Sequence, residues 1–78
     1  MFTPNPIMIK AGFRPAGEVA KLIGKATSTV HRMVQQNRLE GSRDGRALYV
    51  SVESLIAYYE QDGNTAMVRA IKRWAKCG

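Results

Sequence analysis

Apolar residues recur at helical spacing in four separate stretches of the chain. In each stretch they follow the i, i+3, i+4 pattern, which places side chains on one face of an α-helix. The first two stretches are short and close together, and the other two lie nearer the C-terminus. The predicted buried faces are formed by Val19, Leu22 and Ile23; by Val30, Met33 and Val34; by Val52, Leu55, Ile56 and Tyr59; and by Met67, Ala70, Ile71 and Trp74.

Residues typical of helix ends separate these stretches. Pro15 suits the first turn of the first helix, and Gly24 suits the left-handed position after its last residue. Thr27 or Ser28 is expected to cap the second helix, and Asn37 is expected to end it. The remaining boundaries are predicted at Ser51, at Asp62-Gly63 and at Asn64 or Thr65.

The segment between the second and third helices has the spacing of strands. Leu39, Leu48 and Val50 lie on either side of the run Arg43-Asp44-Gly45-Arg46. Asp-Gly is typical of a tight hairpin turn because Gly tolerates positive φ. The sequence therefore predicts two helices joined by a tight turn, then a hairpin, then two further helices.

The two ends of the chain are expected to differ from its centre. Residues 1–12 contain Pro4, Pro6 and Gly12, and they are predicted to form an extended arm. In this arm Ile7-Met8-Ile9 would pair as a short strand, cover an apolar patch or stay mobile. Residues 13–62 would form the one domain that 78 residues allow. Residues 63–78 would form a basic amphipathic helix.

The charge is positive overall and unevenly distributed. The net charge of +6 favours a polyanionic partner, which is DNA, RNA or an anionic membrane. Residues 64–78 carry basic side chains and no acid, whereas residues 38–63 are net acidic. Cys77 is the only cysteine, so there is no disulfide framework, and no apolar stretch approaches the ~18 residues of a membrane span. We therefore expect a soluble cytoplasmic protein.

Catalytic and metal-binding chemistry find no support in the sequence. His31 is the only histidine and has no second ligand close to it. Glu53 and Glu60 fall two turns apart on a helix face that is expected to be exposed, and there is no glycine-rich phosphate-binding loop. The sequence predicts no enzymatic activity, no metal and no cofactor.

The order of the predicted elements is similar to that of a known family. Residues 14–60 resemble the winged helix-turn-helix of phage excisionases and the related DNA-binding head of the MerR regulators. The resemblance covers more than half of the chain and rests on order and spacing, not on one specific motif. The matching residues are Glu18-Val19-Ala20, Leu22-Ile23-Gly24, Ser28-Thr29-Val30, Arg32, Arg38-Leu39, Gly45-Arg46 and Tyr49-Val50-Ser51.

The resemblance implies a mainly helical domain with a small β-hairpin wing that binds duplex DNA sequence-selectively. Residues 28–37 would be the recognition helix in the major groove, and residues 39–50 would be the wing. The predicted contacts are the recognition-helix residues Thr27, Ser28, His31, Arg32 and Gln35; the wing residues Arg43 and Arg46; the phosphate contacts Lys21 and Lys25; and the accessory basic residues Arg69, Lys72, Arg73 and Lys76.

Two roles are compatible with the resemblance. The protein would be an excisionase-like factor that sets the direction of recombination beside an integrase, or a small transcription regulator beside RNA polymerase. It would act in the nucleoid of a bacterium, or come from a phage, as a homodimer or as a cooperative array on DNA. The long dimerisation coil of the MerR regulators is missing, which favours the excisionase comparison.

Two other functions remain open. One is a protein-interaction module that uses the helix around Trp74, with the basic charge serving solubility. The other is a membrane-surface role for that helix.

One departure from the family pattern concerns the start of the recognition helix. Lys25 and Ala26 stand where family members usually have an apolar residue and then a Ser cap. The loss of a good cap typically costs about 1 kcal/mol. Thr27 is therefore expected to become the cap, or the helix is expected to fray without DNA.

Overall fold

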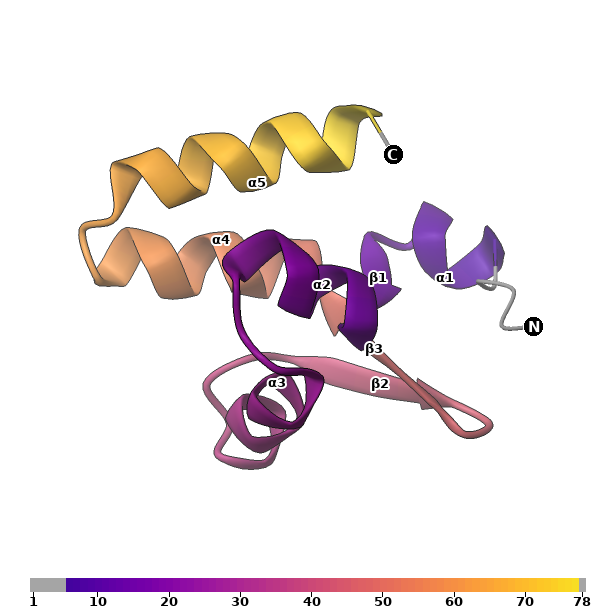
Figure 1. Cartoon of the computed structure of the whole chain (residues 1–78). Coiled ribbons are helices and arrows are strands. Elements are labelled where there is room, and N and C mark those ends of the chain that lie inside the picture. The colour runs from indigo at the N-terminus through magenta and orange to yellow at the C-terminus, as the bar shows by residue number, and fades with distance from the viewer. Residues whose placement is uncertain (1–5, 78) are drawn as a thin grey trace.

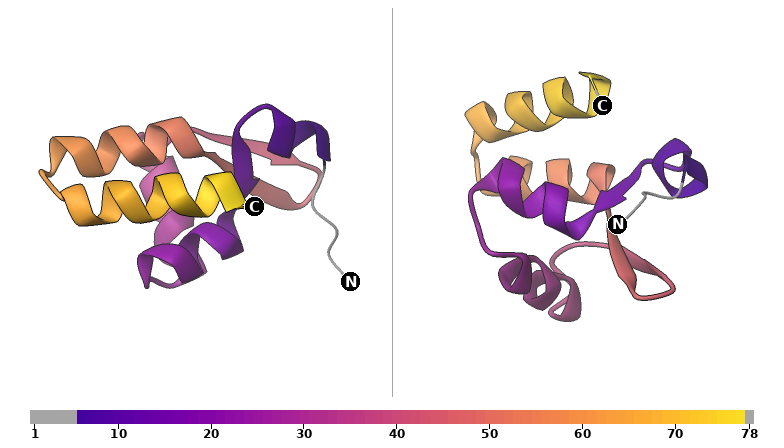
Figure 2. Two further views of the ribbon diagram at one scale, coloured as in Figure 1. Left: turned by 90° about the horizontal axis from the view of Figure 1, so that it is seen from above. Right: turned by 45° about the vertical axis from the view of Figure 1, so that its right-hand side comes forward.

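The computed structural model describes residues 6–77, whose helices and strands stack in three layers. α5 (Thr65–Cys77) forms the outer layer, and α2 (Ala16–Ile23) and α4 (Val52–Gln61) lie beneath it (Figure 1). On the other side of this pair lie α3 (Thr27–Gln35) and the hairpin of β2 (Gly41–Asp44) and β3 (Ala47–Ser51). The same order is visible after rotation about the vertical axis (Figure 2, right). The predicted sequence of two helices, a hairpin and two further helices is confirmed.

The N-terminal segment is helical where an extended arm was predicted. Residues 6–10 form the short helix α1 (Pro6–Lys10), so this part of the prediction is wrong. The physical reason is that Pro6 occupies the first helical position, where its missing N–H costs nothing. Ile7-Met8-Ile9 consequently does not pair as a strand, and Ile7 remains 75% exposed. Residues 1–5 of the predicted arm lie outside the described residues.

A third strand, which the sequence did not predict, completes the sheet. β1 (Phe13–Pro15) pairs antiparallel with β3, so the strand order is β1-β3-β2 and β3 is central. Tyr49 and Val50 of β3 are consequently buried. Pro15 belongs to this strand and precedes the first residue of α2, one position earlier than its predicted place inside the helix. Three residues are too few to show a strand pattern.

Three helices end at the predicted positions, and at each of these ends the chain has a residue in the left-handed region. These residues are Gly24 with φ 71°, Asn37 with φ 60° and Gly63 with φ 74°. After α2, the N–H of Lys25 donates to the carbonyl of Ala20 at 2.9 Å, and the N–H of Gly24 donates to the carbonyl of Lys21. This pair of bonds satisfies carbonyl groups that the helix end would leave without partners. The tight turn between α2 and α3 is thus fixed by its own backbone.

The start of α3 differs from the prediction, whereas the start of α4 agrees with it. Ser51 caps α4, because its hydroxyl accepts a hydrogen bond from the N–H of Ser54 at 3.2 Å. At α3 the cap position belongs to Ala26, and no side chain makes a capping hydrogen bond. Thr27 is already the first helical residue, so its hydroxyl is one position too late to take over as the cap.

The hydrophobic core joins all three layers. Val19, Val30, Val50, Leu55 and Ile71 come from five different elements, and none of them retains exposed surface. The apolar faces predicted for α2, α3 and α4 all contribute to this core. The domain therefore folds around one core that includes α5.

α5 uses its apolar face inside the domain. Val68 and Ile71 are buried and Trp74 is half-buried against the core, so α5 docks on the domain. The stripe itself was predicted with one error, because Ala70 is exposed and Val68 takes its place. α5 packs against α4, and Val68 and Ile71 are the buried residues of α5. Helices are fixed by how their side-chain rows interdigitate, and the sequence of one helix does not specify that choice.

Candidate nucleic-acid interface

α3 exposes the face that the sequence predicted. Val30 and Met33 are buried in the core. Ser28, Arg32 and Gln35 are spaced at i, i+4 and i+7 and are all exposed. Arg and Gln can both make bidentate hydrogen bonds to base edges in the major groove. The outer face of α3 therefore carries side chains suited to reading bases.

The first turn of α3 provides backbone donors for an anion. The first N–H groups of a helix have no acceptor within the helix, and Ala26 supplies no side-chain acceptor for them. Thr27 and Ser28, which carry hydroxyl groups, are exposed at the same end. Helix N-termini attract phosphate because of these free donors and the helix dipole. The missing cap thus leaves a phosphate-compatible site at the start of the recognition helix.

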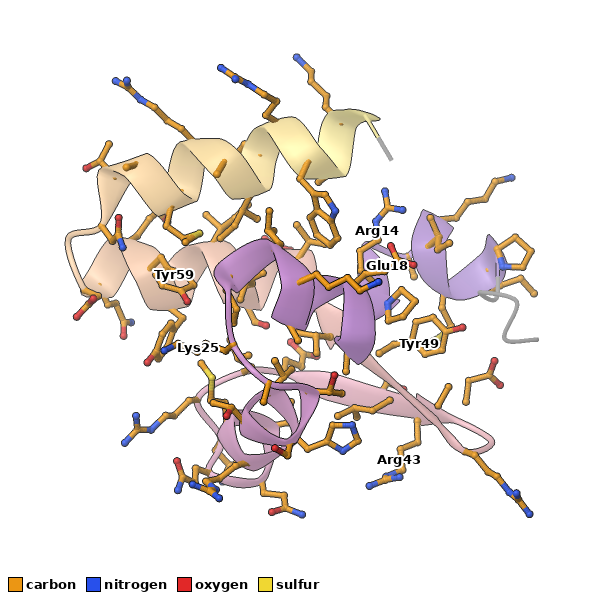
Figure 3. The ribbon with its side chains drawn as sticks, in the orientation of Figure 1. Arg14, Glu18, Lys25, Arg43, Tyr49 and Tyr59 are labelled. Atoms are coloured by element: carbon orange, nitrogen blue, oxygen red, sulfur yellow. The ribbon has the colours of Figure 1, made fainter. Side chains whose placement is uncertain are left out.

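The hairpin forms a wing beside α3. β2 and β3 pair from Gly41 with Val50 to Asp44 with Ala47, and Gly45 and Arg46 form the two-residue turn. Gly45 has a φ of 63°, which L side chains rarely adopt. Arg43 and Arg46 are exposed. Arg43 extends from β2 on the side of the molecule that also holds α3 (Figure 3).

A shallow groove brings together five of the thirteen predicted contacts. It runs between α2, the turn after it, the start of α3 and the wing. Its lining includes Lys21 and Lys25, which were predicted as phosphate contacts. It also includes Thr27 and His31 of the recognition helix and Arg46 of the wing. These residues come from α2, the turn after it, α3 and the turn of the wing, so their convergence is a property of the fold and not of one charged segment.

Small side chains form much of the rest of this groove, and the sequence predicted none of them as a DNA contact. Ala16, Gly17, Ala20, Ala26 and Ala47 all line it. Small residues leave room for a backbone to approach closely. Spacing along the chain gave no signal for them, because they come from both helices and the wing.

The wing is held against α3 at its base. A Cβ atom on Gly41 would lie 2.7 Å from Cγ1 of Val34 and 3.2 Å from Cδ1 of Leu48. Val34 belongs to α3, and Leu48 belongs to β3. The backbone of β2 therefore approaches the recognition helix as closely as a glycine allows.

The predicted accessory residues of α5 do not join this surface. Arg69, Lys72, Arg73 and Lys76 are exposed, but α5 lies on the opposite side of the α2 and α4 layer from α3 and the wing (Figures 1 and 2). The groove and the basic row of α5 are thus two separate positive surfaces.

Comparison with known proteins identifies the arrangement. A family model described as a helix-turn-helix domain matches residues 16–63, which is more than half of the chain. The chain belongs to this helix-turn-helix family. The match covers α2, the turn, α3, the wing and α4, and it supports a protein that binds DNA. No curated protein and no solved structure matched the chain.

The family assignment confirms the resemblance seen in the sequence and the winged helix-turn-helix fold class. In this helix-turn-helix domain, α2 and α3 are the two helices of the motif, and β2 and β3 are the wing. DNA-binding families of this type are typically non-enzymatic. Within the part of the chain that the structure describes, no helix is long and apolar enough to cross a membrane. The same residues contain no group of three potential metal-ligating side chains.

Proposed function

We propose that this helix-turn-helix protein binds duplex DNA sequence-selectively and performs no chemistry on it. In this proposal α3 enters the major groove, where Arg32 and Gln35 read base edges and His31 lies at the border toward the wing. Thr27 and Ser28 hold a phosphate at the start of the helix through their hydroxyl groups and their own backbone N–H groups.

The observation that carries the proposal is the groove shared by α2, α3 and the wing. Lys21, Lys25 and Arg46 line it together with Thr27 and His31 of α3, and Glu18 is the one acidic residue of its lining. Phosphates that flank a major groove occupied by α3 would meet cations from α2, from the turn after it and from the wing. Such contacts fix the register of a protein on DNA, and base contacts then supply the specificity.

The proposed biological role follows from this binding mode. The protein would occupy a site in the nucleoid of a bacterial cell and direct another enzyme there, either an integrase as an excisionase-like factor or RNA polymerase as a small regulator. Binding as a homodimer or as a cooperative array would give repeated half-sites about one helical turn apart.

The alternative of a protein-interaction module has less support. It needs the apolar stripe of α5 as a docking surface, but Val68 and Ile71 are buried in the domain's own core. The guanidinium of Arg14 lies over the ring of Trp74, 5.6 Å from its centroid. A membrane-surface role needs the same apolar face and is weakened by the same packing.

Selection of bound duplexes from a random pool tests the proposal directly. The selected duplexes are expected to share a sequence, and repeats within it would report the half-site spacing. Binding to the selected site should weaken steeply with salt, with a log–log slope of roughly 4 if Lys21, Lys25, Arg43 and Arg46 each neutralise one phosphate. A pool that is not enriched, combined with affinity that does not respond to salt, would contradict the proposal.

A further inference from the structure

Four cationic side chains form a continuous row along the outer face of α5. Arg69, Lys72, Arg73 and Lys76 are spaced at i, i+3, i+4 and i+7, and all are exposed. At 1.5 Å per residue this row extends over about 10 Å. Residues 64–78 contain no acid that could neutralise it from within the helix.

The positive charge of the row is least offset by acidic neighbours at the C-terminal end of α5. Arg69 and Lys72 line a shallow groove together with Glu60 of α4, whose carboxylate offsets part of their charge. Lys72, Arg73 and Lys76 line a second shallow groove with Ile56 and Ala75, and that groove has no acidic residue. Arg73 and Lys76 therefore carry the least compensated charge of the row.

The row is held in place by the domain. Ile71 has no exposed surface, and Val68 is also buried. At the other end of the helix, the guanidinium of Arg14 donates a hydrogen bond to the carbonyl of Ala75 at 3.2 Å. The cationic side chains are thus displayed on a fixed helix, so ordering the backbone costs nothing when a ligand binds.

The position of the row separates it from the proposed DNA-binding face. α5 and α3 lie on opposite sides of the layer formed by α2 and α4 (Figure 1). Packed helices lie about 8–10 Å apart, so two such spacings place the axes of α3 and α5 about 16–20 Å apart. A duplex seated on α3 and the wing would leave the row of α5 pointing away from it.

From this arrangement we infer that α5 is a second phosphate-binding surface, which takes the backbone of a separate stretch of duplex DNA. One copy of the protein then bridges two duplex segments, with α3 on one and α5 on the other. The inference rests on the proposed function for the α3 face and adds a second ligand site to it.

The composition of the row favours DNA over a protein partner. The core of a protein–protein interface is apolar and depleted in lysine. The apolar residues of α5 face inward, and its outer face offers four cations. A phosphodiester backbone needs such point charges and no apolar pocket. The axes of α3 and α5 are about 16–20 Å apart, which is about two Debye lengths at physiological ionic strength, so repulsion between duplexes bound to their outer faces is largely screened.

The test uses the full chain and two short unrelated duplexes, one immobilised on beads and one fluorescent in solution. The wild-type protein is expected to retain the fluorescent duplex on the beads. The double variant Arg73→Gln/Lys76→Gln should lose affinity for the second duplex by roughly tenfold for each phosphate that it no longer neutralises at about 0.1 M salt. Its affinity for a single duplex should remain that of the wild type.

A control variant removes the same charge elsewhere. Lys10→Gln/Arg38→Gln changes two exposed cations that lie outside α5 and outside the groove. This variant should retain the fluorescent duplex on the beads as the wild type does. Bridging that is absent in the wild type, or equal in all three proteins, would overturn the inference. A double variant at α5 that loses single-duplex affinity to the same extent would also overturn it. Wild-type binding to one duplex, measured on the same samples, reports separately on the proposed function.

Discussion

Val34 of α3 and Gly41 of β2 lie in direct contact, because a Cβ atom on Gly41 would be 2.7 Å from Cγ1 of Val34. Real Cβ contacts essentially never become so short. Gly41 has no positive φ, so its backbone conformation does not demand glycine. A glycine is needed at this position because Val34 leaves no room for a side chain. The contact sets the distance between the recognition helix and the base of the wing. We expect DNA affinity to depend on it although neither residue is predicted to touch DNA.

Gly41→Ala should therefore overpack this contact. The added methyl must displace Val34, and overpacking of this kind typically costs about 1–3 kcal/mol. We expect a lower melting temperature and weaker DNA binding, because α3 and the wing are pushed apart. Thermal melts and duplex titrations measure the two effects.

Two further variants make the Gly41 prediction specific. Val34→Ala combined with Gly41→Ala should be less destabilised than the sum of the single variants, because the shortened side chain makes room for the methyl. Gly17→Ala, inside α2, has no atom within 4 Å of the added Cβ and should stabilise the protein by about 0.5–1 kcal/mol. Additive effects at Val34 and Gly41 would show that the two residues do not compete for space.

The helices could be predicted from the sequence because their signals are local. Val30 and Met33 lie one turn apart and already show which face of α3 is buried, and thus which face is free. β1 could not be predicted, because three residues carry no pattern and its partner strand β3 lies far along the chain. Arg14 contributed only a charge to the sequence analysis, since its partner Ala75 follows 61 positions later.

In the groove, too, the contacts join residues that are far apart in the sequence, so the sequence alone did not predict it. Lys21 and Lys25 were predicted as phosphate contacts and Arg46 as a wing contact, and only the folded chain brings them to one groove. The alanines that line the rest of the groove have no charged or hydrogen-bonding side chain that would mark them as DNA contacts in a sequence. Their role arises from where α2, α3 and the wing meet, which is set by packing between distant segments.

The uncapped start of α3 gives a prediction about stability. Ala26 has the extended conformation of a cap residue, with φ −72° and ψ 149°, and lacks only an acceptor. Ala26→Thr should supply that acceptor and stabilise the free protein by about 1 kcal/mol. Ala26→Val has nearly the same shape without the hydroxyl and serves as the control. Equal melting temperatures for the two variants would mean that the hydroxyl makes no capping bond.

Arg32 is predicted to read bases. Arg32→Ala should cost about 1–3 kcal/mol on the preferred site and relax the base preference there, with the melting temperature nearly unchanged, because Arg32 is exposed. Arg38→Ala removes the same charge just beyond the end of α3 and should leave the base preference intact. Selection from random duplexes with each variant measures the preference. An unaltered preference in Arg32→Ala would exclude this residue from base recognition.

The wing arginines are predicted to position the protein without reading sequence. Replacing Arg43 and Arg46 by Gln should weaken binding to all duplexes by similar factors. The log–log salt slope should fall by about 0.9 for each phosphate that the variant no longer neutralises. Titrations over a range of salt concentrations on preferred and unrelated duplexes measure both quantities. A weakening confined to the preferred duplex would instead assign the wing to base recognition.

Arg14 is predicted to hold α5 on the domain. Its guanidinium lies 5.6 Å from the ring centroid of Trp74 and donates to the carbonyl of Ala75 at 3.2 Å. It therefore adds a cation–π contact and a hydrogen bond at the C-terminal end of a helix, where positive charge is favourable. Arg14→Met keeps much of the aliphatic stem and should cost about 1–2 kcal/mol, since only the charged end is removed.

A double-mutant cycle separates the two contacts of Arg14. If the ring contact contributes, Trp74→Leu and Arg14→Met should together cost less than the sum of their separate effects. The remaining destabilisation would report the hydrogen bond to Ala75, which the Trp74 variant leaves in place. Proteolysis should then cut α5 faster in Arg14→Met than in the wild type, because release of this end exposes the helix. Equal stability and equal cleavage rates would show that burial of Ile71 and Val68 alone holds α5 in place.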